Sequence, residues 1–168
     1  MPDGVEVLPR GVSLEGVLRF TEVAARALEA AREEVDALNV YPVPDGDTGT
    51  NMYLTIAAAR DAVETAVAEA GGPAECGVGP GLAALGRGAL LGARGNSGVI
   101  LSEMLRALAR RLAEAGPEDR AAAVMADGMR LAADAAYAAV GTPVEGTMLT
   151  VARAAAEAAG EVAVDPAA

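Results

Sequence analysis

The segment from Asp45 to Asn51 combines residue types that could bind a metal ion and a phosphate. Asp45 and Asp47 are separated by a single glycine, so their carboxylates can converge on one side of a bend. Magnesium is a hard ion that prefers one or two carboxylates together with water and phosphate oxygens. The residues from Thr48 to Asn51 are predicted to open a helix, whose free N–H groups would suit an anion. Spacing alone equally allows a solvated loop in which Asp47 caps that helix.

Two other readings of the paired aspartates fail on their neighbours. A calcium-binding EF-hand loop that began at Asp45 would need glycine at its sixth position and glutamate at its twelfth, where Thr50 and Ile56 stand. A phospho-aspartate phosphatase would carry its aspartates at the end of a buried strand. Pro42 and Pro44 make such a strand improbable, because proline cannot donate to a sheet.

A second polar segment, Gly92 to Gly98, precedes an apolar helical run. Its small residues would let a ligand approach the backbone, and Ser97 could donate to a phosphate. Arg94 supplies a fixed positive charge that could stabilise a transferring phosphoryl group. The segment is not a P-loop, because it lacks the Gly-Lys-Ser/Thr ending. Tight packing of Gly and Ala between helices remains the simpler alternative.

A third segment, Thr142 to Met148, is another entry from a loop into a helix. On its own it is better explained by an ordinary helix start, with Pro143 in the preceding turn.

The elements that carry these segments are predicted to be helices. Apolar residues recur at three- and four-residue spacing, and Gly and Pro clusters interrupt that spacing. Alanine dominates the apolar residues while aromatic residues are few, which favours closely packed helices over a sheet. About six helices and no confident strand are expected, over roughly 14–38, 50–69, 81–91, 99–112, 118–140 and 145–162.

Composition excludes several classes of function. The formal net charge of −11 argues against a nucleic-acid partner, because a phosphate backbone requires clustered basic residues. The chain has no histidine, which excludes phosphohistidine chemistry, an imidazole base and a histidine zinc ligand. A polyphosphate that carries its own divalent metal remains compatible with the acidic charge.

The cellular setting is predicted to be the cytoplasm. Cys76 is the single cysteine, so no internal disulfide can form. The first residues have neither a basic region nor an apolar run typical of a signal peptide. No uncharged apolar run approaches the length of a membrane span, so none is expected.

Taken in order, the three segments resemble one family. Asn39 to Met52 is similar to the signature of the nucleotide-binding domain shared by dihydroxyacetone kinases and bacterial fatty acid kinases. Gly92 to Ser102 resembles the second signature of that domain, and Pro143 to Val151 the third. The likeness runs from about Val12 to Gly160, which is far more specific than a lone glycine motif.

The form of the motifs is closest to the fatty acid kinase branch, through Pro-Asp-Gly-Asp-Thr-Gly-Thr-Asn and Arg-Gly-Asn-Ser-Gly. The dihydroxyacetone branch usually has a third aspartate upstream. Asn39, or Val40 on a strict count, stands there in this chain, so an amide or water is expected where the other branch uses a carboxylate.

The resemblance implies an all-α fold of antiparallel amphipathic helices in a closed barrel, with the nucleotide at one end. It implies ATP and two magnesium ions held by Asp45 and Asp47, with Asn39 as a further metal ligand. Asp45, Asp47 and Arg94 are the expected catalytic residues. The expected nucleotide-binding residues are Thr48, Gly49, Thr50, Asn51, Gly95, Asn96, Ser97, Gly98, Thr147 and Met148. The implied acceptor is a fatty acid presented by a separate lipid-binding protein, and the product an acyl phosphate.

One domain is expected over residues 12–162, with an N-terminal extension over 1–11 and a tail over 163–168. The family's eight-helix domain normally continues for another helix or two, with a Val-Asp-Ala/Ser-Gly-Gly type of loop, so the chain is expected to be C-terminally incomplete and a poor kinase alone. The alternatives are a dihydroxyacetone-type kinase subunit, a nucleotide-binding regulatory module without catalysis, and a structural bundle that forms a homodimer through alanine-rich faces.

Overall fold

The computed structural model describes residues 12–40 and 44–164, and in these ranges every regular element is a helix. The predicted extension over 1–11, the Tyr41–Val43 part of the first motif and residues 165–168 of the predicted tail lie outside the described residues. The helices are α1 Leu14–Leu38, α2 Thr48–Ala70, α3 Pro73–Cys76, α4 Val78–Gly92, α5 Gly95–Ala113, α6 Ala121–Ala138 and α7 Met148–Val164. The predicted all-α class is confirmed.

Several helix boundaries differ from the predicted ones, for reasons that lie in Gly and Pro. The short α3 was not predicted, and it occupies part of the Gly/Pro loop that precedes α4. Helix α4 begins at Val78 and contains Pro80 in its first turn, where no intrahelical N–H bond is lost. Helix α5 begins at Gly95, four residues before the predicted start, so the glycine segment is itself the first turn of this helix.

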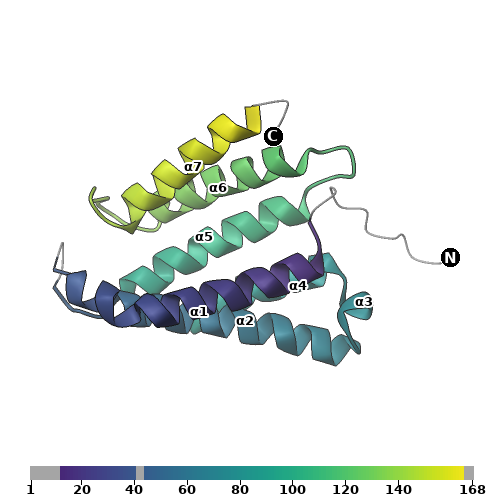
Figure 1. The fold of residues 1–168 in the computed structure, drawn as a ribbon, viewed down its shortest axis with the longest axis horizontal. Coiled ribbons are helices and arrows are strands. Elements are labelled where there is room, and N and C mark those ends of the chain that lie inside the picture. Colours follow the sequence, from purple (N-terminus) through teal and green to yellow (C-terminus); the bar gives the residue numbers. More distant parts are fainter. Residues whose placement is uncertain (1–11, 41–43, 165–168) are drawn as a thin grey trace.

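The helices are arranged as an open bundle (Figure 1). Helices α1, α2 and α4 pack together, α5 lies against α4 and α2, and α6 and α7 follow in order on the far side of α5. Among the described elements, α7 packs extensively only on α6, and α1 packs on α2 and α4. The bundle is therefore open between α1 and α7, where the resemblance implied a closed barrel.

Small residues set the spacing between the helices. A side chain at Gly88 would collide with Ala58 and Ala62 of α2, and one at Gly92 would collide with Ala58. Helices α2 and α4 therefore approach closely along a glycine face. Larger side chains fill the main core, which includes Ile56, Val63, Leu82, Leu85, Leu105, Leu112 and Val124. Alanines dominate the contact between α6 and α7, where Ala133, Ala152 and Ala156 are buried.

Three hydroxyl groups are fully buried in the bundle and bond to their own helices. Thr21 donates to the carbonyl of Leu18, Thr55 to that of Asn51, and Ser102 to that of Val99, at 2.9, 2.7 and 2.8 Å. Satisfied in this way, they carry little desolvation penalty. No helix within the described ranges is long and apolar enough to cross a membrane.

The helix directions bring three N-termini to one end of the bundle. Gly95 and Gly98 at the start of α5 abut Asn51 and Thr55 at the start of α2, so these two helices begin side by side and run in the same direction. Helix α7 begins at that end as well, because its first residues Met148 and Leu149 pack against Ile100 in the first turns of α5. The C-terminal turn of α1 completes this end. The loops that hold the predicted site residues are therefore brought together.

Candidate nucleotide and metal site

A cavity of about 970 Å³ opens at the end of the bundle where α2, α5 and α7 begin. Its polar lining comes from all three sequence segments and the end of α1. The predicted residues that line it are Asn39, Asp45, Asp47, Thr48, Asn96, Ser97, Thr147 and Met148. The structure thus gathers eight predicted site residues around one space, although they are spread over more than a hundred positions of the sequence.

The two carboxylates lie at the mouth of this cavity. Gly46 between them has a φ of 63°, a left-handed conformation that side chains rarely adopt, and it makes the bend that separates the two aspartates. Asp45 is exposed and accepts a short hydrogen bond from the side-chain amide of Asn39, whereas Asp47 is half-buried. Asn39 makes this bond through its amide nitrogen, so its side-chain carbonyl oxygen can still serve as a metal ligand.

This donor set suits a hard divalent cation. No group of three or more His, Cys, Asp or Glu side chains that could hold a metal occurs within residues 12–40 and 44–164. Two carboxylates and an amide oxygen, completed by water and phosphate oxygens, are what magnesium accepts, whereas a structural zinc site requires four protein ligands.

Asp47 stands at the N-cap position of α2, yet its side chain caps nothing. Its carbonyl accepts the first helical hydrogen bond, from Asn51 N–H at 2.8 Å, and its carboxylate makes no capping bond. The N–H and the hydroxyl of Thr50 donate instead to the carboxylate of Asp36 on α1, at 3.0 and 2.6 Å. The hydroxyl bond is the largest of several that hold the pKa of Asp36 below its usual value.

Sequence analysis did not identify Asp36 as a functional residue, because it occupies an ordinary polar position in the amphipathic pattern of α1. Thr50, predicted to contact phosphate, does not line the cavity and already uses its N–H and hydroxyl on Asp36. Gly49 lies against the backbone of Arg32, where a side chain would not fit. The structure thus places Gly49 and Thr50 at the contact between α1 and α2.

The first turn of α5 presents backbone N–H groups without a side-chain cap. Gly95 has a φ of 57°, and the N-cap residue Arg94 makes no capping bond. Asn96 and Ser97 line the cavity, and Ser97 is buried. Gly98 does not line it and packs against the Thr55 hydroxyl. A helix start of this kind carries a partial positive charge that favours an anion.

Asn51 is the most unusual polar group near this helix start. Its side chain is 8% exposed, and its amide nitrogen is buried without a hydrogen-bond partner. That nitrogen lies against Gly95, where any side chain would collide with it. An unpaired buried amide carries a desolvation penalty. Asn51 and Gly95 were both predicted to bind nucleotide, but neither lines the cavity; they contact each other where the first turns of α2 and α5 meet.

Arg94 is not brought into the cavity. Its guanidinium is exposed and donates to the carbonyl of Ala93 at 3.0 Å. Arg94 is the N-cap residue of α5 and does not line the cavity. The predicted contact of Arg94 with a phosphoryl group therefore depends on a side-chain rotation away from this position.

The remaining wall of the cavity is apolar. It combines side chains of α1, α5, α7 and the loop before α7, namely Val35, Leu38, Val99, Ile100, Val140, Val144, Met148, Leu149 and Val151. Leu38 and Val151 are 71% and 69% exposed, which is unusual for side chains of their size. The cavity therefore has a polar side at the starts of α2 and α5 and an apolar side between α1 and α7.

Glu145 holds together the loop that forms the floor of the cavity. It accepts hydrogen bonds from the Tyr137 hydroxyl, the Thr150 hydroxyl and the Arg153 guanidinium at 2.9, 2.6 and 3.1 Å. The bond from Thr150 is the largest cause that lowers the pKa of Glu145, and partial burial raises the pKa of Tyr137. Thr147 donates to the carbonyl of Val144 at 2.8 Å. The loop is thus ordered by contacts within α6, α7 and their connection.

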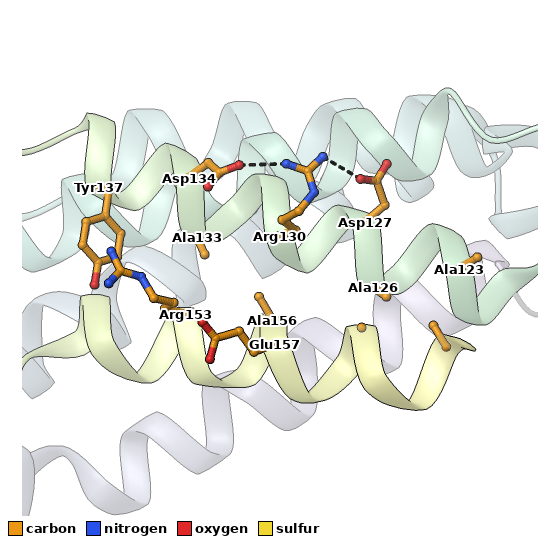
Figure 2. Close-up of a pocket in the computed structure, with 12 residues that line it drawn as sticks. Ala123, Ala126, Asp127, Arg130, Ala133, Asp134, Tyr137, Arg153, Ala156 and Glu157 are labelled. Carbon is orange, nitrogen blue, oxygen red and sulfur yellow. Dashed lines mark hydrogen bonds and ion pairs between the residues drawn. The ribbon is translucent and has the colours of Figure 1, made fainter. Parts of the chain in front are cut away.

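A second hollow, of about 780 Å³, runs along the groove between α6 and α7 (Figure 2). Alanines line its bottom, and Arg130 bonds to Asp127 and Asp134 along its α6 edge at 2.7 and 2.9 Å. Figure 2 also shows the guanidinium of Arg153 beside the Tyr137 ring, 3.9 Å from its centroid. None of the predicted site residues lines this groove.

Several staphylococcal proteins are similar in sequence to this chain. A protein from Staphylococcus saprophyticus is 47% identical over 135 residues, which cover 80% of this chain and 23% of the relative. A Staphylococcus aureus protein is 44% identical over 139 residues, covering 83% and 24%. A Staphylococcus epidermidis protein is 44% identical over 135 residues, covering 80% and 23%. The chain spans about a quarter of the length of these relatives, all described as uncharacterized proteins.

The family model of the DAK2 domain matches residues 42–168, which include all three signature segments except the first residues of the first one. This match covers most of the chain and every helix from α2 to α7. The protein belongs to the DAK2 domain family.

Proposed function

We propose that the cavity binds a magnesium–ATP complex and that the chain is the nucleotide-binding domain of a kinase. One observation carries this proposal. The carboxylate residues Asp45 and Asp47 and the uncapped first turn of α5 line one cavity of about 970 Å³, beside the unpaired buried amide of Asn51. Asp45 and Asp47, with Asn39, would hold the metal. The first turn of α5 and Ser97 would contact the phosphates.

The charge of the molecule supports a metal-bound polyphosphate over a free anion. All 13 basic residues of the chain are arginines, and none of those within residues 12–40 and 44–164 lines the cavity. A bare triphosphate would meet two carboxylates without any opposing side-chain charge. A cation between carboxylates and phosphates removes that repulsion, so ATP binding is expected to depend strictly on magnesium.

The chemistry that fits is phosphoryl transfer, which depends on positioning and charge stabilisation more than on a protein base. A divalent cation, when bound, neutralises negative charge on the phosphates. The chain's own part is to hold that charge with Asp45 and Asp47 and to orient phosphate oxygens with backbone N–H groups at the start of α5. A carboxylate acceptor is already ionised at neutral pH, so the absence of histidine is no obstacle.

The apolar wall supports a fatty acid as the acceptor. Leu38, Val99 and Val151 extend the cavity toward solvent as an exposed apolar surface. An acyl chain could contact this wall while its carboxylate reaches the polar side, and a separate lipid-binding protein would present it.

We expect the protein to be located in the cytoplasm. A homodimer stays a prediction.

A nucleotide-binding module without transfer is the second candidate. Its support is the position of Arg94, which donates to Ala93 outside the cavity and leaves the cavity without a positive side chain. The two candidates share the binding site and differ in turnover. Incubation with magnesium–ATP, a fatty acid and a lipid-binding protein, followed by an assay for acyl phosphate, separates them.

The binding proposal is tested by calorimetric titration of ATP into the chain, with and without magnesium. We expect binding with magnesium, none without it, and at least a tenfold loss in Asp47→Asn. Asp61→Asn makes the same charge change at an exposed position of the same helix, remote from the cavity, and serves as the control. Equal affinity with and without magnesium, or unaltered binding by Asp47→Asn, would show that the metal assignment is wrong.

A further inference from the structure

Helix α2 has an aspartate at its N-cap, yet another aspartate does the capping. An N-cap aspartate ordinarily accepts a hydrogen bond from the N–H of the second or third residue of its own helix. Asp47 makes no such bond. The third residue of α2 is Thr50, and its N–H is bonded to Asp36 of α1 at 3.0 Å.

Thr50 contacts Asp36 through two hydrogen bonds. The Thr50 hydroxyl donates to the other carboxylate oxygen of Asp36 at 2.6 Å, so both oxygens are used. Gly49 makes this approach possible, because any side chain there would collide with the backbone of Arg32 one turn before Asp36. Asp36 itself lies outside the cavity lining, whereas Asp47 is part of it.

We infer that Asp36 is a positioning residue that caps α2 in place of Asp47 and so leaves the Asp47 carboxylate free to face the cavity. The N–H groups of Gly49 and Thr50, the second and third residues of α2, both act on Asp36, so Asp47 has no free donor of this kind to turn toward. Its carboxylate therefore stays at the cavity with that of Asp45. The functional part of this inference rests on the proposed magnesium–ATP site, whereas the capping part does not.

The Asp36 cap should be detectable in the chain without any metal. In the metal-free chain, the Thr50 N–H should exchange slowly with solvent both in the unaltered chain and in Asp47→Ala. In Asp36→Ala, Asp47 is expected to turn inward and restore part of the protection. Only the double variant should leave this N–H unprotected. Amide hydrogen exchange is measured for the unaltered chain, the two single variants and the double variant. Loss of Thr50 N–H protection in the single variant Asp47→Ala would overturn the inference.

The second measurement is the affinity for magnesium–ATP. Loss of an outer residue that orients a metal ligand typically weakens metal binding by about 10–100-fold, so Asp36→Ala is expected to lose about tenfold. Asp36→Asn keeps a carbonyl acceptor for the Thr50 N–H and is expected to stay within about threefold of the unaltered chain. Equal losses in both variants would assign the effect to the charge of Asp36 and overturn its capping role.

Glu22→Ala is the matched control. Glu22 also joins α1 to α2, through Arg60 at 3.7 Å, but at a distance from the cavity. It should leave magnesium–ATP affinity unaltered, which separates capping from general weakening of the α1–α2 contact. Affinity in Asp36→Ala equal to that of the unaltered chain would refute the inference while leaving the proposed function intact. Absence of magnesium–ATP binding by the unaltered chain would contradict the proposed function and the positioning role together, whatever the exchange data say of the cap.

Discussion

Replacement of Asn51 by leucine should stabilise the unliganded chain and weaken its binding of nucleotide. Asn51 is 8% exposed, and its amide nitrogen has no hydrogen-bond partner. Leucine has nearly the same branched shape, so it should fill the space against Gly95 without an unpaired donor. Asn51 does not itself line the cavity, so we expect the substitution to weaken nucleotide binding by altering the contact between the first turns of α2 and α5.

The size of the effect follows from the cost of an unsatisfied buried polar group, about 1–3 kcal/mol. Because leucine will not match the asparagine contacts perfectly, we expect a net gain of about 1–2 kcal/mol in the free energy of unfolding. For a chain of this length, each kcal/mol raises the Tm by about 2–4 °C, so the expected rise is about 2–8 °C.

Thermal unfolding of the unaltered chain and Asn51→Leu, with and without magnesium–ATP, measures both effects. A ligand at one hundred times its Kd adds about 2.7 kcal/mol of stability, so the unaltered chain should show a larger ligand-induced rise than the variant. Ser102→Ala is the control, because its buried hydroxyl is satisfied by Val99, and its loss should lower stability. An Asn51→Leu variant that is less stable than the unaltered chain, or that binds magnesium–ATP equally well, would refute the reasoning.

Three further outcomes are expected. Gly88→Val should lower the free energy of unfolding, measured in urea, by about 1–3 kcal/mol. The reason is that a β-carbon at Gly88 would lie 2.8 Å from the Ala58 carbonyl oxygen in the α2 backbone. Unchanged stability would mean that α2 and α4 pack less closely than described. The lowered pKa of Glu145 means that its contribution to stability is present above the ordinary glutamate pKa and is lost as the pH falls through the lower folded value. Acid titration should therefore reduce the stability of the unaltered chain more than that of Glu145→Gln, and parallel curves would contradict the role of its hydrogen bonds. Arg94→Ala should bind magnesium–ATP within about twofold of the unaltered chain, because Arg94 lies outside the cavity; a larger loss in calorimetry would mean that this side chain rotates inward.

Local chemistry made much of this protein predictable. Alanine-rich periodicity indicated helices, and the polar Gly-containing segments indicated where they begin, because N-caps and turns depend on a few neighbouring residues. The errors concern the same glycines. The turn of Gly95 to Gly98 was assigned to a loop, yet it is helical, because contacts with Asn51 and Thr55 of α2 favour small residues in the first turn of α5.

The sequence by itself determined the all-α class, the strongly acidic charge and the three segments that could form a site. Only the tertiary structure decided which of their residues meet. It placed Asp47, Ser97 and Thr147 around one cavity, directed Arg94 away from it, and joined Asp36 to Thr50. The physical reason is that helix starts and turns depend on adjacent residues, whereas a contact between α1 and α2 depends on how closely their backbones pack. A carboxylate in an amphipathic helix looks the same in the sequence whether it faces water or caps a neighbouring helix.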